Sequence, residues 1–198
     1  MLGIIVDGFK AVVSVISKLA ISMIDIIGPA IMALCKALGL VKDEEKLDEM
    51  GDKAIQAEES GIKLENYSSF QEYMEAIDNF PLDPEKSKSI SYEEKMRRGT
   101  TIASCGLQEK FPNAPVAELI RLVSEYPLLF TERKFTELGS LLKQDPKSLE
   151  GIVDFLNGKA KNDIIIDQAV NSLKMMSKSE NPNISDKEII KEIMHLRK

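Results

Sequence analysis

Residues 1–41 form a nearly uninterrupted apolar stretch, and a protein in water has to bury most of such a stretch. It holds 28 hydrophobic residues and five charges, whereas 43% of the whole chain is hydrophobic. Its polar residues recur at steps of three and four, so they would share one side of an α-helix instead of alternating as in a strand. This polar stripe consists of Asp7, Lys10, Ser14, Ser17, Lys18, Ser22 and Asp25.

The apolar side of this predicted helix is unusually wide. At 100° per residue the stripe leaves roughly 220° of apolar surface, more than the one-sided face of a helix that lies on a domain. The expected packing face consists of Ile5, Phe9, Val12, Val13, Ile16, Leu19, Met23 and Ile27. We therefore expect neighbours on nearly every side of the helix.

Gly28 and Pro29 are expected to interrupt this helix. Proline lacks the amide donor and disfavours helical geometry in the residue before it, but it is well suited to open a new helix. The sequence therefore predicts a hairpin or a sharp kink, with a second helix over 30–40 that Gly39 ends. Ala30, Ala33 and Ala37 lie on one side of that second helix and would let another helix approach closely.

Three ways of burying the stretch remain open. The rest of the chain can surround it, or copies of the chain or helices of a partner protein can pack on it, with the polar stripe lining an axis or facing the partner. Lipid is the third way, since residues 4–27 are long enough to span a bilayer. However, Lys18 would lie in mid-span, at a cost of roughly 2.5–3.5 kcal/mol unless it is paired or faces water.

The remaining chain is predicted to be helical in two parts, which gives an all-α protein of three segments. Residues 42–85 are expected to form an acidic helical connector that ends in a linker near residue 85, since residues 42–99 carry 16 acidic and 9 basic residues. Residues 86–198 are expected to form a compact bundle of five or six short helices. On this interpretation, residues 90–198 should stay folded after residues 1–41 are deleted.

Capping residues predict where the helices of the third segment begin. Residues at or beside such starts are Ser91, Pro115, Thr131, Pro146, Asn162 and Ser185. Ser185 and Glu188 have the spacing of a capping box.

No group of residues indicates an enzyme, a cofactor site or a small-molecule substrate. The chain has one histidine, His195, which cannot build a histidine-based zinc site alone, and Cys35 and Cys105 lack the spacing of metal ligands. We expect buried thiols, with a disulfide left open. The acidic middle and only five arginines argue against nucleic-acid binding.

These features favour a non-enzymatic structural or assembly protein. It would self-associate or dock into a larger complex, such as a phage-tail or secretion-type machine, through the apolar N-terminal helix. The alternative is a membrane-active or pore-forming protein whose hydrophobic helices insert into lipid. No basic residue precedes the apolar run and Lys10 interrupts it, so we expect cytoplasmic synthesis without a secretory signal, with a membrane or a secreted particle as candidate destinations.

Overall fold

A computed structural model describes residues 2–127 and 130–196 of the chain, with side chains from residue 7 onward. Within these ranges the protein is all helical and contains no strand, which confirms the expected fold class. The α-helices are α1 Leu2–Ile16, α2 Ile21–Ala37, α3 Leu47–Glu59, α4 Phe70–Asp78, α5 Pro84–Ser89, α6 Tyr92–Lys110, α7 Val116–Glu125, α8 Glu132–Gln144, α9 Ser148–Leu156, α10 Asp163–Glu180 and α11 Asp186–Leu196, and a 3-10 helix covers Leu64–Asn66.

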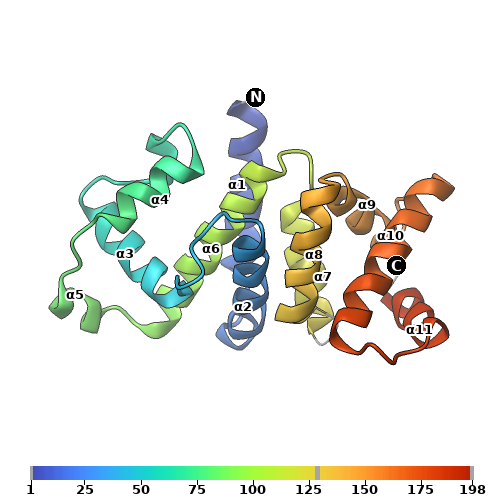
Figure 1. The fold of residues 1–198 in the computed structure, drawn as a ribbon. Coiled ribbons are helices and arrows are strands. Elements are labelled where there is room, and N and C mark those ends of the chain that lie inside the picture. Colours follow the sequence, from blue (N-terminus) through green and yellow to red (C-terminus); the bar gives the residue numbers. More distant parts are fainter. Residues whose placement is uncertain (1, 128–129, 197–198) are drawn as a thin grey trace.

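Helix α6 is the centre of the first half of the fold. It packs against α1, α2, α3, α4 and α7 (Figure 1). Its residues 99, 100 and 102–108 are all buried, including the polar side chains of Thr100, Ser104 and Gln108. Thr100 and Ser104 bond to carbonyl oxygens of the preceding turn, and the Gln108 amide donates to carbonyls of the following loop. These bonds satisfy the buried polar atoms, so α6 can be enclosed on nearly every side.

Two glycines bring α3 and α6 into backbone contact. A Cβ atom on Gly51 would lie 1.9 Å from the carbonyl oxygen of Lys95, and one on Gly99 would lie 2.0 Å from that of Leu47. Backbone atoms cannot move aside as the end of a flexible side chain can. The absence of a side chain at both positions therefore sets how closely the two helices approach.

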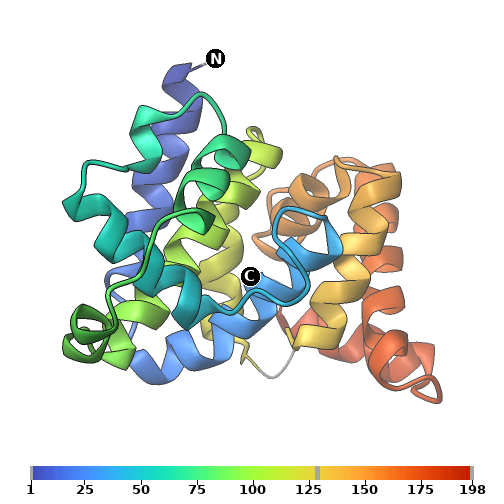
Figure 2. The ribbon, with the colours of Figure 1, turned by 60° about the vertical axis from the view of Figure 1, so that its left-hand side comes forward.

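Helix α2 joins the two halves of the molecule. It packs on α3, α6 and α7 and also on α8, while α8, α9, α10 and α11 pack on one another (Figures 1 and 2). Its buried residues are Ile24, Ile27, Gly28, Ala30, Ile31, Met32, Leu34 and Cys35. For α2, therefore, the chain itself supplies the neighbours that the apolar composition demands.

The break in the N-terminal stretch lies elsewhere than expected. Helix α2 runs through Gly28 and Pro29, so the expected hairpin there is wrong and the chain breaks at residues 17–20, whereas a kink at Gly28 and Pro29 stays a prediction. Interior proline costs a helix about 3 kcal/mol. The buried residues on both sides of Pro29 compensate by packing on α6 and α8. Gly39, with φ of +70°, follows the end of α2 as expected.

Arg97 explains the break at residues 17–20. Its Nη1 donates to the carbonyl oxygens of Ile16 at 2.7 Å and Leu19 at 2.8 Å. Carbonyls at the end of a helix lack partners within the helix, and this guanidinium supplies one from α6. The corner between α1 and α2 is thus held by a residue about 80 positions away in the chain.

Five of the six expected helix starts of the third segment are confirmed, whereas α9 begins at Ser148, two residues after Pro146. Ser91 and Glu94 form a capping box at the start of α6, and the side chains of Thr131 and Asn162 cap α8 and α10. Ser185 and Glu188 exchange the expected capping-box hydrogen bonds at α11. Local side-chain chemistry decides these boundaries, so they can be predicted from short stretches of sequence.

The acidic connector is not a spacer between two bodies. Helix α3 has a thin apolar stripe, with Leu47, Met50, Ala54 and Ala57 buried, and it packs on α6. The expected linker contains α5, which is tied to α3 by hydrogen bonds between Gln56 and the backbone of Asp83. Packing therefore crosses residues 41 and 85, although the division into segments 1–41, 42–85 and 86–198 stays a prediction about independent folding.

Candidate functional site

The seven residues of the predicted polar stripe are all exposed, but they do not follow one helix. Asp7, Lys10 and Ser14 lie on α1, Ser17 and Lys18 lie in the turn, and Ser22 and Asp25 lie on α2. The break at residues 17–20 gives the two helices different directions (Figure 1). A role of these residues in lining an oligomer or a pore stays a prediction.

The residues of the predicted apolar face differ widely in how far they are buried. Val12, Ile16 and Ile27 are fully buried, while Phe9, Leu19 and Met23 are half-buried. Val13 is 47% exposed, and the side chain of Ile5 lies outside the described residues. Helix α1 contacts α6 and α7 along this one side, so neighbours surround α2 but not α1.

One line of α2 remains open to solvent. Ser22, Ile26, Pro29, Ala33 and Lys36 follow one another at helical spacing along it. Ile26 is 45% exposed, and the next three are half-buried, whereas the rest of α2 between Ile24 and Cys35, apart from Asp25, is buried. We call this row the open line of α2. Within residues 24–35, the apolar surface of α2 reaches solvent along this row.

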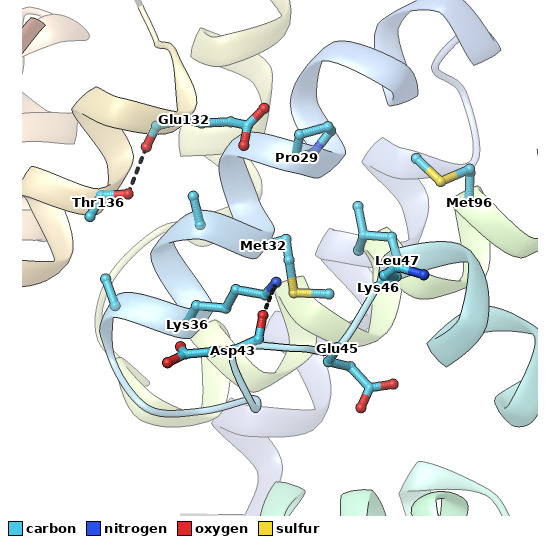
Figure 3. Close-up of a pocket in the computed structure, with 12 residues that line it drawn as sticks. Pro29, Met32, Lys36, Asp43, Glu45, Lys46, Leu47, Met96, Glu132 and Thr136 are labelled. Atoms are coloured by element: carbon cyan, nitrogen blue, oxygen red, sulfur yellow. Dashed lines mark hydrogen bonds between the residues drawn. The ribbon is translucent and has the colours of Figure 1, made fainter.

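The C-terminal part of the open line forms the floor of a groove of about 490 Å³ (Figure 3). Pro29, Met32 and Ala33 come from α2, while Leu47 and Met96 extend the apolar floor from α3 and α6. One wall is the first turn of α8, and the other is the loop before α3. The wall residues are Glu132 and Thr136 on α8 and Asp43, Glu45 and Lys46 in or beside the loop.

The small residues of α2 act partly as expected. A Cβ atom on Gly139 of α8 would lie 2.5 Å from the Cβ of Ala37, so the two helices approach closely at that point. Ala30 is buried. Ala33, in contrast, faces the groove, where no helix of the described chain covers it.

The charges of the groove are unevenly paired. The Lys46 ammonium lies 2.7 Å from a Glu49 carboxylate oxygen, and Lys53 lies 3.6 Å from that of Glu45. The Lys36 ammonium donates to the backbone carbonyl of Asp43 at 2.6 Å. Among the described residues, the carboxylates of Asp43 and Glu132 have neither an ion pair nor a hydrogen bond, although the backbone carbonyl of Glu132 accepts from Thr136.

A buried charge cluster fixes the loop wall. Glu45 is 7% exposed, and burial raises the pKa of its carboxyl above the usual value, an effect that Lys53 only partly offsets. Lys53 also lies 3.5 Å from Asp78 of α4, which pairs with Lys42. These contacts tie the loop to α3 and α4, so this wall of the groove is anchored.

A second buried carboxylate holds α5. Burial would raise the pKa of Asp52, but hydrogen bonds from Lys95, Ser87 and Gln56 outweigh it and lower this pKa. The Lys95 ammonium lies 2.8 Å from the carboxylate, and the Gln56 amide 2.9 Å. With its neighbours this carboxylate is fully satisfied, and it performs a structural role.

The residues that the sequence offers for chemistry lie apart from one another. Cys35 and Cys105 are free buried thiols, and burial raises the pKa of both, that of Cys105 to about 12. Such thiols are largely protonated and unreactive at neutral pH. His195 is exposed on α11. Within the described ranges, no three potential metal ligands are grouped.

Sequence reasoning missed the walls of the groove. Nothing in the sequence marks Glu132 and Thr136 as one surface with α2, since α2 and α8 belong to segments that were expected to be separate. A sequence signal existed only for the floor, where Ala33 belongs to the small-residue side of α2. The walls depend on the tertiary packing of α2.

Comparisons of the chain with known proteins found no relative. The chain matches no protein-family model, no curated protein and no solved structure. None of the described helices combines the length and apolar character that a membrane crossing requires.

Proposed function

We propose that this protein is a non-enzymatic assembly protein that docks a helix of another protein, or of a second copy, on the open line of α2. The proposal depends on the contrast within α2, which is largely buried between Ile24 and Cys35 and yet leaves Ile26 45% exposed beside an apolar groove. Apolar side chains of a partner helix at steps of three and four would cover Ile26, Pro29 and Ala33. The small side chain of Ala33 would allow close approach.

The floor of the groove suits such a partner. Met32 and Met96 are flexible and polarizable side chains, which adapt to the shape of a bound group. The loop wall is anchored, so docking would not require this loop to rearrange. An apolar floor with a polar rim is the usual anatomy of a protein interface.

A photo-crosslinking amino acid tests this proposal. It would replace Ile26 in one version of the protein and Val13 in another, since these two side chains are almost equally exposed, at 45% and 47%. We expect irradiation in the cells that make the protein to give one product of defined mass from position 26. Mass spectrometry of that product separates a second copy from a different protein.

Two outcomes contradict the proposal. A discrete product from position 13 alone would show that the docking surface is on α1 and not on α2. If neither position gives a discrete product, the proposed docking surface is wrong. Leakage of dye from lipid vesicles mixed with the purified protein, together with no product at position 26, would favour the membrane-active alternative instead.

A further inference from the structure

The chemistry of the groove indicates what kind of helix it accepts, an inference that rests on the docking role proposed for α2. Two of the five charges on its rim, Lys46 and Glu45, are paired with residues outside it. The three others are Lys36, Asp43 and Glu132, which leave one net negative charge. The groove therefore has an electrostatic preference of its own.

These three charges are not equivalent in position. Lys36 is held on the loop side by the carbonyl of Asp43, at 2.6 Å. The Glu132 carboxylate lies on the opposite wall and points toward Pro29, apart from the Lys36 ammonium (Figure 3). The Lys36 ammonium bonds to the backbone of Asp43, so this cation lies near Asp43 and not near Glu132 (Figure 3), and we call Glu132 the isolated charge of the groove.

Glu132 also has a local role in the fold. It is the first residue of α8, where a negative charge interacts favourably with the helix dipole. That role needs no counterion beside the carboxylate. A cation brought by a ligand would therefore find the carboxylate unpaired, beside a floor made of Pro29, Met32 and Ala33.

We propose that the groove binds an amphipathic helical segment of a partner protein that carries a lysine or arginine about one turn from its apolar side chains. The apolar side chains would cover Pro29, Met32 and Ala33, and the cation would lie against Glu132. Arginine fits best, because its planar guanidinium can pair with both oxygens of a carboxylate. Apolar contact supplies most of the affinity, and the charge sets the preference for the partner.

The test is a selection of random peptides displayed on phage against the purified protein. Peptides that bind wild type are then measured by fluorescence anisotropy against Ala33→Trp, which fills the groove, and Glu132→Gln, which removes its isolated charge. Glu150→Gln, at an exposed position on α9, is the matched control. Circular dichroism establishes that each variant is folded before binding is measured.

We expect the selected peptides to combine apolar residues at helical spacing with at least one lysine or arginine. Ala33→Trp should abolish their binding, and Glu132→Gln should weaken it roughly two- to fivefold, the range of a partly exposed ion pair. Glu150→Gln should leave binding unchanged. Replacing the basic residue of the peptide by norleucine should remove the difference between wild type and Glu132→Gln.

The two proposals fail in different ways. Peptides that need an open groove but lack basic residues, or that bind Glu132→Gln as well as wild type, would overturn the charge preference and leave docking on α2 intact. If no selected peptide loses binding in Ala33→Trp, both the charge preference and the docking role are wrong.

Discussion

Helices α1 and α2 come from the same apolar stretch, yet the fold treats them differently. Eight residues of α2 within Ile21–Ala37 are buried, and it packs against α3, α6, α7 and α8. Helix α1 packs mainly against α6 and α7, and among its described side chains only Val12 and Ile16 are fully buried. Equal apolar content therefore led to one central helix and one peripheral helix.

The difference teaches that composition decides how much surface must be buried, whereas chain connectivity decides which helix is enclosed. Helix α2 packs on α3, α6 and α7 and also on α8, and all four of these helices follow it in the chain. Helix α1 lies behind α6 in the view of Figure 1, and α6 and α7 cover one side of it. The polar-stripe residues of α1 lie on the side that is exposed to solvent.

Truncation should give the largest difference between the two helices. Removing residues 1–19 should leave a folded protein that is less stable, since it loses Val12, Ile16 and the partly buried contacts of Phe9 and Leu19. Removing residues 1–41 should abolish cooperative unfolding. Each fully buried large side chain contributes about 1.5–3 kcal/mol, and the loss of α2 would exceed a total stability of about 5–15 kcal/mol.

Urea unfolding followed by circular dichroism measures both truncations. The expectation for residues 1–41 reverses the one drawn from the sequence, where residues 90–198 were expected to fold alone. A sharp, cooperative transition in protein that lacks residues 1–41 would show that α2 is not the centre of the fold.

The sequence predicted the features that depend on neighbours in the chain. Capping residues such as Ser91, Thr131 and Ser185 placed helix starts correctly, because their hydrogen bonds reach only three residues along. The break at residues 17–20 was out of reach, because the hydrogen bonds that hold it come from Arg97 on α6, about 80 positions away in the chain. For the same reason the floor of the groove had a sequence signal, but its wall at Glu132 did not.

Adjacent isoleucines of α2 allow a second, sharper comparison within one helix. Ile27 is fully buried and Ile26 is 45% exposed. Ile27→Ala should lower the free energy of unfolding by about 2–5 kcal/mol, because it leaves a cavity between α2 and its neighbours. Ile26→Ala should change it by about 0.5 kcal/mol or less. Equal losses in urea titrations would contradict the one-sided exposure of α2.

One glycine in each helix allows the packing of α1 and α2 to be compared. A Cβ on Gly28 of α2 would lie 2.8 Å from both Leu47 Cδ1 and Thr100 Oγ1, and one on Gly8 of α1 would lie 2.7 Å from the Gln108 side chain. Thr100 is buried and bonded to Met96, so it cannot move aside. Gly28→Ala should therefore cost about 1–3 kcal/mol.

Gly8→Ala should cost less than half as much. Gln108 has weak bonds of 3.2–3.4 Å that can adjust, and alanine gains up to about 1 kcal/mol over glycine in a helix. Thermal unfolding of the two variants side by side measures the difference. If Gly8→Ala is the more damaging of the two, α1 is held more rigidly than α2.

The corner between the two helices should show a smaller effect than the buried positions of α2. Arg97→Gln removes the donors to the carbonyls of Ile16 and Leu19, at an expected cost of about 1–2 kcal/mol. Arg98→Gln is the matched control, because its pair with Glu58 is on the surface and should be worth at most about 1 kcal/mol. Trypsin cleavage after Lys18 reports opening of the corner, and Arg97→Gln should speed it roughly five- to thirtyfold. The same acceleration in Arg98→Gln would mean that loss of charge on α6, and not loss of these two hydrogen bonds, loosens the corner.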